Sequence, residues 1–429
     1  MLLSKYKSFL EQKHRFLKFI RTAFGNMIKE KTYKKVKHMN PENIQLMNLL
    51  TSHILEQDNV RIIPNVDWHR LISIAERQNI LEMIGDKLLG IKEQALFTSE
   101  ESQNLYMRIM KRIYLTSKKF ERAISMLELM HQNGIRVIVL KGCAVRDLYP
   151  VPEWRTMGDI DILIAPCDMK RAKALFEEHG YEVKGTPKRE FDCYKDKNIP
   201  WEIKCTLEAE FKDSYVKWDK MYFDSVQPWK YNQYMPLSTL LFQHIIIHTA
   251  GNLSTVGAGV RNLCDIALCM MKLTDIDYSS VKQTCEEEGY IKVYNALMNC
   301  VRYWFDIDIS HTGAELLSDE AVENITEYML SETIYGKRNA DNRLINWTLR
   351  RDESISPWRK VFFPSIKLLK MPYPYLKKYP FLLPAAWIQR GYDAVFKQKI
   401  PISQMIKGAK ESVDYAKEHE EYMKKLGLK

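Results

Sequence analysis

Two aspartates separated by one residue are the part of this sequence best suited to chemistry. Asp159 and Asp161 lie in the run DIDILI (159–164), whose alternation of acidic and apolar residues is typical of a β-strand. Successive side chains of a strand point to opposite faces, so both carboxylates share one face while Ile160 and Ile162 point into a core. Like charges this close repel unless a cation lies between them. The spacing therefore predicts a site for Mg²⁺ or Mn²⁺, which prefer oxygen ligands.

A third carboxylate is expected from a separate strand. Glu202 lies in the run PWEIKCT (200–206), with Trp201 and Ile203 on the opposite face. A carboxylate from a neighbouring strand would complete a two-metal site, which stabilises both the attacking and the leaving oxygen of an in-line displacement. We therefore predict that Asp159, Asp161 and Glu202 are the metal ligands and the catalytic residues.

The segment before the aspartates is suited to binding phosphate. Gly142 ends a predicted strand and opens a short helix, where backbone N–H groups and the helix dipole favour an anion. Lys141 adds a positive charge, and Arg155 could reach a triphosphate or a negative group of an acceptor. On its own, a Lys-Gly pair after a strand is typical of an ordinary turn. The order of strand, glycine turn, short helix and two acidic strands is what favours a nucleotide site.

Two histidines later in the chain have three interpretations. His244 and His248 are four residues apart in a predicted helix, so they share a face and could hold a metal. No HExxH glutamate accompanies them, which favours either a place lining the nucleotide cleft or a hydrogen-bonded pair in the core. Arg261 and Asp265 are also four apart and predict a helix ion pair.

The elements that position these residues follow from the hydrophobic pattern. Apolar residues three and four apart predict helices through residues 41–134 and again from residue 236 to about 349. Between them, strands are predicted at 135–140, 159–164, 181–185, 190–195 and 200–207, with a helix at 166–180. This order predicts an α+β fold, with a small mixed sheet and flanking helices embedded in largely helical N- and C-terminal regions.

The pattern also suggests four parts of the chain. They are a basic N-terminal helix and helical region (1–117), a catalytic core (118–235), a helical domain that completes the cleft (236–350), and a basic C-terminal region rich in proline and aromatic residues (351–429).

Composition and charge limit the class of protein. The chain has 429 residues, of which 46% are hydrophobic, enough for two or three folded domains. Its eight cysteines form no CxxC pair, which argues against a zinc ribbon and a disulfide framework. We find no signal peptide and no run long enough to span a bilayer. We therefore expect a cytoplasmic protein, either free or peripheral on a membrane.

Both ends of the chain are strongly basic. Residues 1–38 hold eleven Lys or Arg against two Glu, and residues 355–407 hold ten against one Asp. In the C-terminal segment aromatic residues alternate with lysines, a composition found at membrane interfaces and also on basic surfaces over an aromatic core. These ends could contact an anionic membrane or nucleic acid, although no nucleic-acid-reading module is recognisable.

Taken together, the motifs resemble a known family. The chain is similar to the nucleotidyltransferases of the DNA polymerase beta type, and more closely to the bacterial branch of uncharacterised nucleotidyltransferases. The resemblance covers roughly residues 118–275 and rests on Leu140-Lys141-Gly142, Tyr149-Pro150, Arg155, Gly158-Asp159-Ile160-Asp161, His244, His248, Arg261 and Asp265. One departure from the wider superfamily is Cys143, which replaces the serine of the phosphate turn and is either a reactive thiol or a small filler.

The resemblance implies an enzyme that moves a nucleoside monophosphate from an NTP to an acceptor hydroxyl or phosphate and releases pyrophosphate. Lys141, Gly142, Arg155, His244 and His248 would then contact the nucleotide, and replacing Asp161 with Asn should abolish transfer without unfolding the chain. Two alternatives remain open at this point. One is a non-catalytic module of the same fold that docks to a membrane or a partner through its basic ends, and the other is a toxin-like nucleotidyltransferase acting on RNA.

Overall fold

A computed structural model describes most of the chain. The described residues are 39–91, 97–186, 188–196, 198–207, 211, 215–254, 257–331, 363–369, 373–393 and 421–428. The predicted basic helix at 1–38 lies outside them, and the basic segment 355–407 is described only in part. The described residues all belong to one compact unit. The division into four parts stays a prediction.

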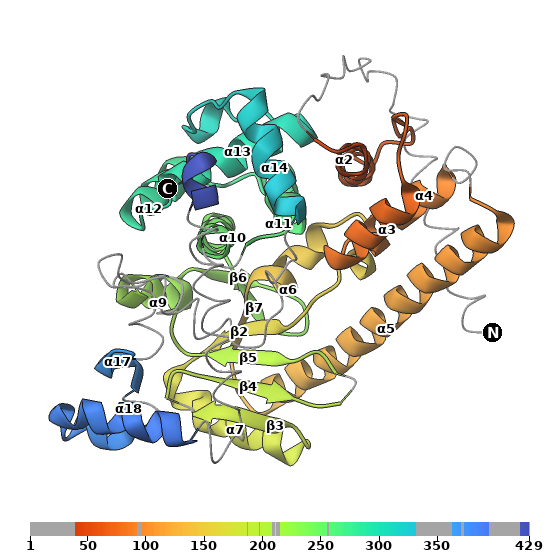
Figure 1. The fold of residues 1–429 in the computed structure, drawn as a ribbon. Coiled ribbons are helices and arrows are strands. Elements are labelled where there is room, and N and C mark those ends of the chain that lie inside the picture. The colour runs from red at the N-terminus through yellow and green to blue at the C-terminus, as the bar shows by residue number, and fades with distance from the viewer. Residues whose placement is uncertain are drawn as a thin grey trace. The chain divides into compact units, whose positions relative to one another are not determined.

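The described strands form one mixed seven-stranded sheet (Figure 1). Its spatial order is β3-β4-β5-β2-β1-β7-β6. The bounds in chain order are β1 Val137–Val139, β2 Ile160–Ile164, β3 Glu182–Thr186, β4 Glu190–Tyr194, β5 Trp201–Lys204, β6 Val226–Pro228 and β7 Tyr234–Pro236. The central strand β2 pairs antiparallel with β1 and parallel with β5. The sequence predicted β1 to β5 but neither β6 nor β7.

Helices lie on both sides of these strands in the chain, which confirms the α+β prediction. Before β1 come α2 Pro41–Ile54, α3 Trp68–Arg77, α4 Leu81–Gly90 and α5 Ser99–Gln132; among the strands come α6 Lys141–Val145, α7 Met169–Glu178 and α9 Tyr215–Asp224. After β7 come α10 Ser238–Leu253, α11 Arg261–Lys272, α12 Tyr278–Glu287, α13 Ile291–Phe305, α14 Asp319–Ser331, α17 Ile366–Leu369 and α18 Leu383–Tyr392. No helix in the described part of the chain is long and apolar enough to cross a bilayer.

The long helix α5 is fixed against the first strand of the sheet. It begins at a capping box, in which the Thr98 hydroxyl accepts from the Glu101 amide and the Glu101 carboxylate accepts from the Thr98 amide. Its far end is joined to the sheet by the buried side chain of Gln233. That amide donates to the Leu127 carbonyl at 2.9 Å and accepts from the Val137 amide at 2.9 Å. β1 is thereby fixed against α5.

The side of the sheet opposite the carboxylates is apolar. Ile160, Ile162 and Ile203 are fully buried, and Phe176 of α7 packs edge-on against Trp201 with ring centroids 5.3 Å apart.

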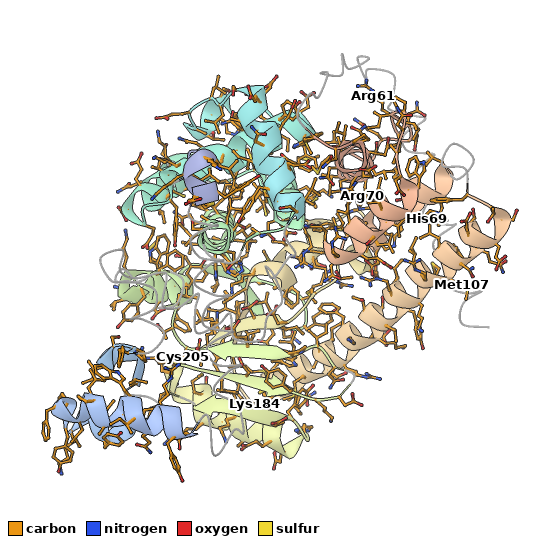
Figure 2. The ribbon with its side chains drawn as sticks, viewed as in Figure 1. Arg61, His69, Arg70, Met107, Lys184 and Cys205 are labelled. Carbon is orange, nitrogen blue, oxygen red and sulfur yellow. The ribbon has the colours of Figure 1, made fainter. Side chains whose placement is uncertain are left out.

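All eight cysteines lie in described residues and none forms a disulfide, as their spacing predicted. Figure 2 labels one of them, Cys205, directly after β5.

Candidate active site

The two aspartates are positioned by β2. Asp159 directly precedes the strand, and Asp161 lies within it between the buried Ile160 and Ile162. The strand is held on both sides at this point, because the Leu140 amide donates to the Asp161 carbonyl at 3.0 Å and the Ile160 amide donates to the Pro200 carbonyl at 2.9 Å. Asp159 keeps contact with solvent, whereas Asp161 is buried. The alternation of the strand thus places both carboxylates on the polar face, as predicted.

Glu202 joins them from β5. β2 and β5 run parallel in a register that pairs Asp161 with Glu202, so the two side chains emerge side by side. Oxygen atoms of Asp159, Asp161 and Glu202 all lie within 4.8 Å of one another. Two ligands of one Mg²⁺, at bonds of about 2.0–2.1 Å, are at most roughly 4.2 Å apart. Neighbouring ligands of an octahedral ion are only about 2.9 Å apart, so the side chains would have to close by up to roughly 2 Å to hold one ion together. The donor set fits Mg²⁺ or Mn²⁺.

Two lysines lie against the acidic cluster. Lys141 Nζ donates to Asp161 Oδ1 at 2.9 Å. Lys204 Nζ is 3.7 Å from the same oxygen and 3.2 Å from Glu202 Oε1, and its side chain is only 3% exposed. The sequence analysis missed Lys204, although a signal was present. Lys204 follows Glu202 by two residues in β5, so the period of the strand puts both on one face.

The lysines and the burial set the protonation of the three carboxyl groups. Burial opposes the ionisation of Asp161, but Lys141 and Lys204 outweigh it and hold its pKa well below the usual range. Burial and then the Asp161 charge raise the pKa of Asp159. Burial raises the pKa of Glu202 to about 7, with the Asp161 charge acting in the same direction and the lysines against it. In the metal-free site burial and the Asp161 charge therefore favour the protonated form of Glu202.

The turn between β1 and α6 requires its glycine for a steric reason. Lys141 has a left-handed backbone with φ of +44°, a conformation that costs roughly 1–2 kcal/mol in a residue with a side chain. A Cβ added to Gly142 would lie 2.6 Å from Arg155 Nη1. Glycine thus allows the guanidinium of Arg155 to pack directly against the turn.

Arg155 is held by a buried ion pair. Its Nε and Nη2 atoms donate to the two oxygens of Asp265 at 2.8 and 2.6 Å, and the Tyr149 hydroxyl donates to Asp265 Oδ1 at 2.6 Å. Burial opposes the ionisation of Asp265, but Arg155 outweighs it and lowers the pKa of Asp265. These bonds favour a role for Arg155 in positioning the turn rather than the expected contact with phosphate.

The predicted helix ion pair between Arg261 and Asp265 is replaced by other partners. Arg261 Nη1 donates to the Thr156 carbonyl at 3.0 Å, while the Asp265 carboxylate accepts from Arg155 and Tyr149. The positive charge of Arg261 also lowers the pKa of Asp159 against the larger effects of burial and of Asp161. Arg261 therefore contributes to the electrostatics of the acidic cluster from α11.

The two histidines lie in different surroundings. His244 is fully buried, and its ring packs edge-on against Phe211 and Tyr222 with centroids 5.9 and 5.6 Å away. His248 is half-buried, and its Nε2 lies 3.0 Å from Asn252 Nδ2. This places His244 in an aromatic core and favours a structural role for it. A place for His248 beside the nucleotide stays a prediction.

Cys143, in the position of the expected phosphate-binding serine, is a packing residue. Its side chain is buried, and burial raises the pKa of the thiol to about 12. Such a thiol stays protonated and unreactive at neutral pH.

Comparison with known protein families agrees with this site. The model of a family described as uncharacterised nucleotidyltransferase matches residues 64–306, more than half of the chain. The matched segment contains every strand of the sheet, the acidic cluster and the helices from α3 to α13. No match was found among curated proteins, and none among solved structures. The acidic cluster lies within the matched segment, and the chain belongs to the uncharacterised nucleotidyltransferase family.

Proposed function

We propose that the protein transfers a nucleoside monophosphate from an NTP to an acceptor hydroxyl or phosphate and releases pyrophosphate. The observation that carries this proposal is the convergence of Asp159, Asp161 and Glu202 within 4.8 Å, inside a domain that belongs to a nucleotidyltransferase family. In the reaction an acceptor oxygen forms a bond to the α-phosphorus, and the bond from that phosphorus to the oxygen bridging to the β-phosphate breaks. The electron pair leaves with pyrophosphate.

The three carboxylates would hold Mg²⁺ or Mn²⁺. When bound, such ions neutralise the charge on the phosphates and stabilise the attacking and leaving oxygens. Asp161 is the fixed member of the set, because it is buried and held by its backbone neighbours. Glu202 lies at the rim, with its side chain 32% exposed, where it can take the proton of an acceptor hydroxyl.

The lysines would change partners as the substrate enters. In the metal-free site both ammonium groups face Asp161. Lys141 lies in the turn beside Gly142 and has a long flexible side chain, so it can swing from the carboxylate to the phosphates. Lys204 is almost fully buried within β5 and is suited to stay in place as a fixed counter-charge. The buried Arg155–Asp265 pair would keep the turn in shape during this exchange.

Calorimetric titration with each of the four NTPs, with and without Mg²⁺, tests the proposal. The wild-type chain should bind one or more NTPs only in the presence of Mg²⁺, and Asp159→Asn should lose this binding. Asp275→Asn, which changes an exposed aspartate outside the cluster, is the matched control and should bind as the wild type does. A folded wild-type chain that binds no NTP would contradict the proposal and would favour a non-catalytic module.

A further inference from the structure

A second feature of the molecule, separate from the acidic cluster, is the unit formed by α17 and α18. Residues 363–369 and 373–393 build a small core of their own from Leu369, Tyr373, Leu376 and Ala386. The Trp387 indole donates to the Pro364 carbonyl at 2.9 Å, and the Tyr375 hydroxyl donates to the Gln389 side chain at 2.9 Å. The segment therefore has a packed core, while the choice between a solvated basic surface and a membrane contact stays a prediction.

The outer face of the same unit is also apolar. Phe381 is 75% exposed and Ile388 76% exposed, although residues of this kind are normally buried. Phe381, Ala385, Ile388 and Tyr392 are spaced four, three and four residues apart, so they form one stripe along α18 and the turn before it. Phe363, at 53% exposure, packs edge-on against Trp387 and adds to this surface. We call this set the α18 stripe; α18 is drawn in blue in Figure 1.

The sequence of this unit has a net positive charge. Between residues 363 and 393 the sequence holds four lysines and one arginine against a single aspartate. Lys378 is exposed, with its ammonium 5.4 Å from the centre of the Tyr379 ring. Exposed aromatic and aliphatic side chains next to lysines are the composition of helices that lie in the interface of an anionic bilayer.

We propose that the α18 stripe is a docking surface for an anionic lipid membrane. Phe381 and Ile388 would enter the boundary between headgroups and acyl chains, while the exposed Lys378 and Tyr379 remain at the headgroups. The helix would lie along the surface, since its ten residues are too few to span a bilayer. The face opposite the stripe stays packed on the small core, so docking requires no unfolding.

Vesicle flotation of the full chain tests this proposal. The chain should float with vesicles of phosphatidylcholine and phosphatidylserine but not with phosphatidylcholine alone, and added salt should weaken binding because it screens the charges. Phe381→Ser combined with Ile388→Ser should lower the partition coefficient by about tenfold or more, since two large apolar side chains no longer enter the lipid. Lys378→Glu should also weaken binding to the anionic vesicles while leaving the apolar stripe intact.

Leu316→Ser is the matched control. Leu316 is 73% exposed but lies between α13 and α14, away in sequence from the basic segment, and its replacement should leave flotation unchanged. Equal flotation on neutral and anionic vesicles, no flotation, or full flotation of the Phe381/Ile388 variant would overturn the proposal. Sedimentation velocity gives a further test. If the wild-type chain is a dimer, the double variant is a monomer and neither binds lipid, then a second copy of the chain covers the stripe and the proposal is wrong.

Discussion

The stability of the metal-free chain should fall when Asp161 is replaced with Asn but should change little when Asp159 is. Asp161 is buried and faces two ammonium groups, whereas Asp159 keeps contact with solvent and lies beside a like charge. Asp161→Asn removes the counter-charge of Lys141 and Lys204 and should destabilise the metal-free chain. Asp159→Asn relieves repulsion and should not. The prediction that Asp161→Asn does not unfold the chain stands, but we now expect that variant to be less stable than the wild type.

The size of the difference follows from the distances. At an effective dielectric constant of about 20, attraction across 2.9 Å to Lys141 is roughly 6 kcal/mol and across 3.7 Å to Lys204 roughly 4 kcal/mol. Removing the carboxylate also removes its desolvation cost and its repulsion of Asp159. Breaking a buried ion pair typically leaves a net loss of about 3–5 kcal/mol. Asp159→Asn removes both the repulsion from Asp161 and the attraction to the nearby lysines and Arg261, and these nearly cancel. We therefore expect its free energy of unfolding to change by no more than about 1 kcal/mol.

Urea denaturation in the presence of EDTA measures both effects as free energies of unfolding. Asp275→Asn serves as the control for an exposed aspartate and should match the wild type. Both site variants should lose Mg²⁺-dependent NTP binding, so activity alone does not distinguish them. Equal stability of Asp159→Asn and Asp161→Asn would refute the reasoning that the two lysines neutralise Asp161.

Three further predictions concern neighbouring groups. The Glu202 pKa of about 7 lies above its unfolded value. The proton on Glu202 therefore stabilises the metal-free fold in acid, and this contribution of about 1–3 kcal/mol to the free energy of unfolding is lost as pH rises through 7. Urea denaturation across pH should show this loss in the wild type but not in Glu202→Gln. Lys204→Met should lower the melting temperature without metal and enlarge the gain on adding Mg²⁺. Lys184→Met on the exposed face of β3 (Figure 2) should do neither. Gly142→Ala should cost about 1–3 kcal/mol in chemical denaturation, because the added methyl overlaps Arg155; a loss below about 0.5 kcal/mol would contradict that packing.

Much of the fold followed from the sequence because its strands and helices have clear periods. The run at 159–164 alternates over its first four residues and the run at 201–207 throughout, and the structure confirms strands β2 and β5 within them. β6 and β7 were missed because each has only three residues and contains a proline, too short for a period of two to show. α5, Ser99–Gln132, lies within the stretch predicted to be helical, and its buried Leu105, Ile109 and Ile113 show the four-residue spacing on which that prediction rests.

The candidate site was predictable where it depends on local spacing and obscure where it depends on distant contacts. The acidic residues of β2 share a face through alternation alone. The partner of Asp265 could not be read from local spacing, because the four-residue interval to Arg261 suggests a helix pair while the actual partner, Arg155, is 110 residues away. The burial of His244 likewise depends on aromatic rings from outside its own helix.

The Arg155–Asp265 pair has a practical consequence for attempts to trim the protein. A fragment ending at residue 235 would contain Arg155 and Tyr149 but not α11, which supplies Asp265. The guanidinium packed against the Gly142 turn would then have no counter-charge, a loss comparable to the whole stability of many small domains. A fragment meant to carry this active site must therefore include α11, and chimeras that exchange the sheet between relatives must exchange α11 with it.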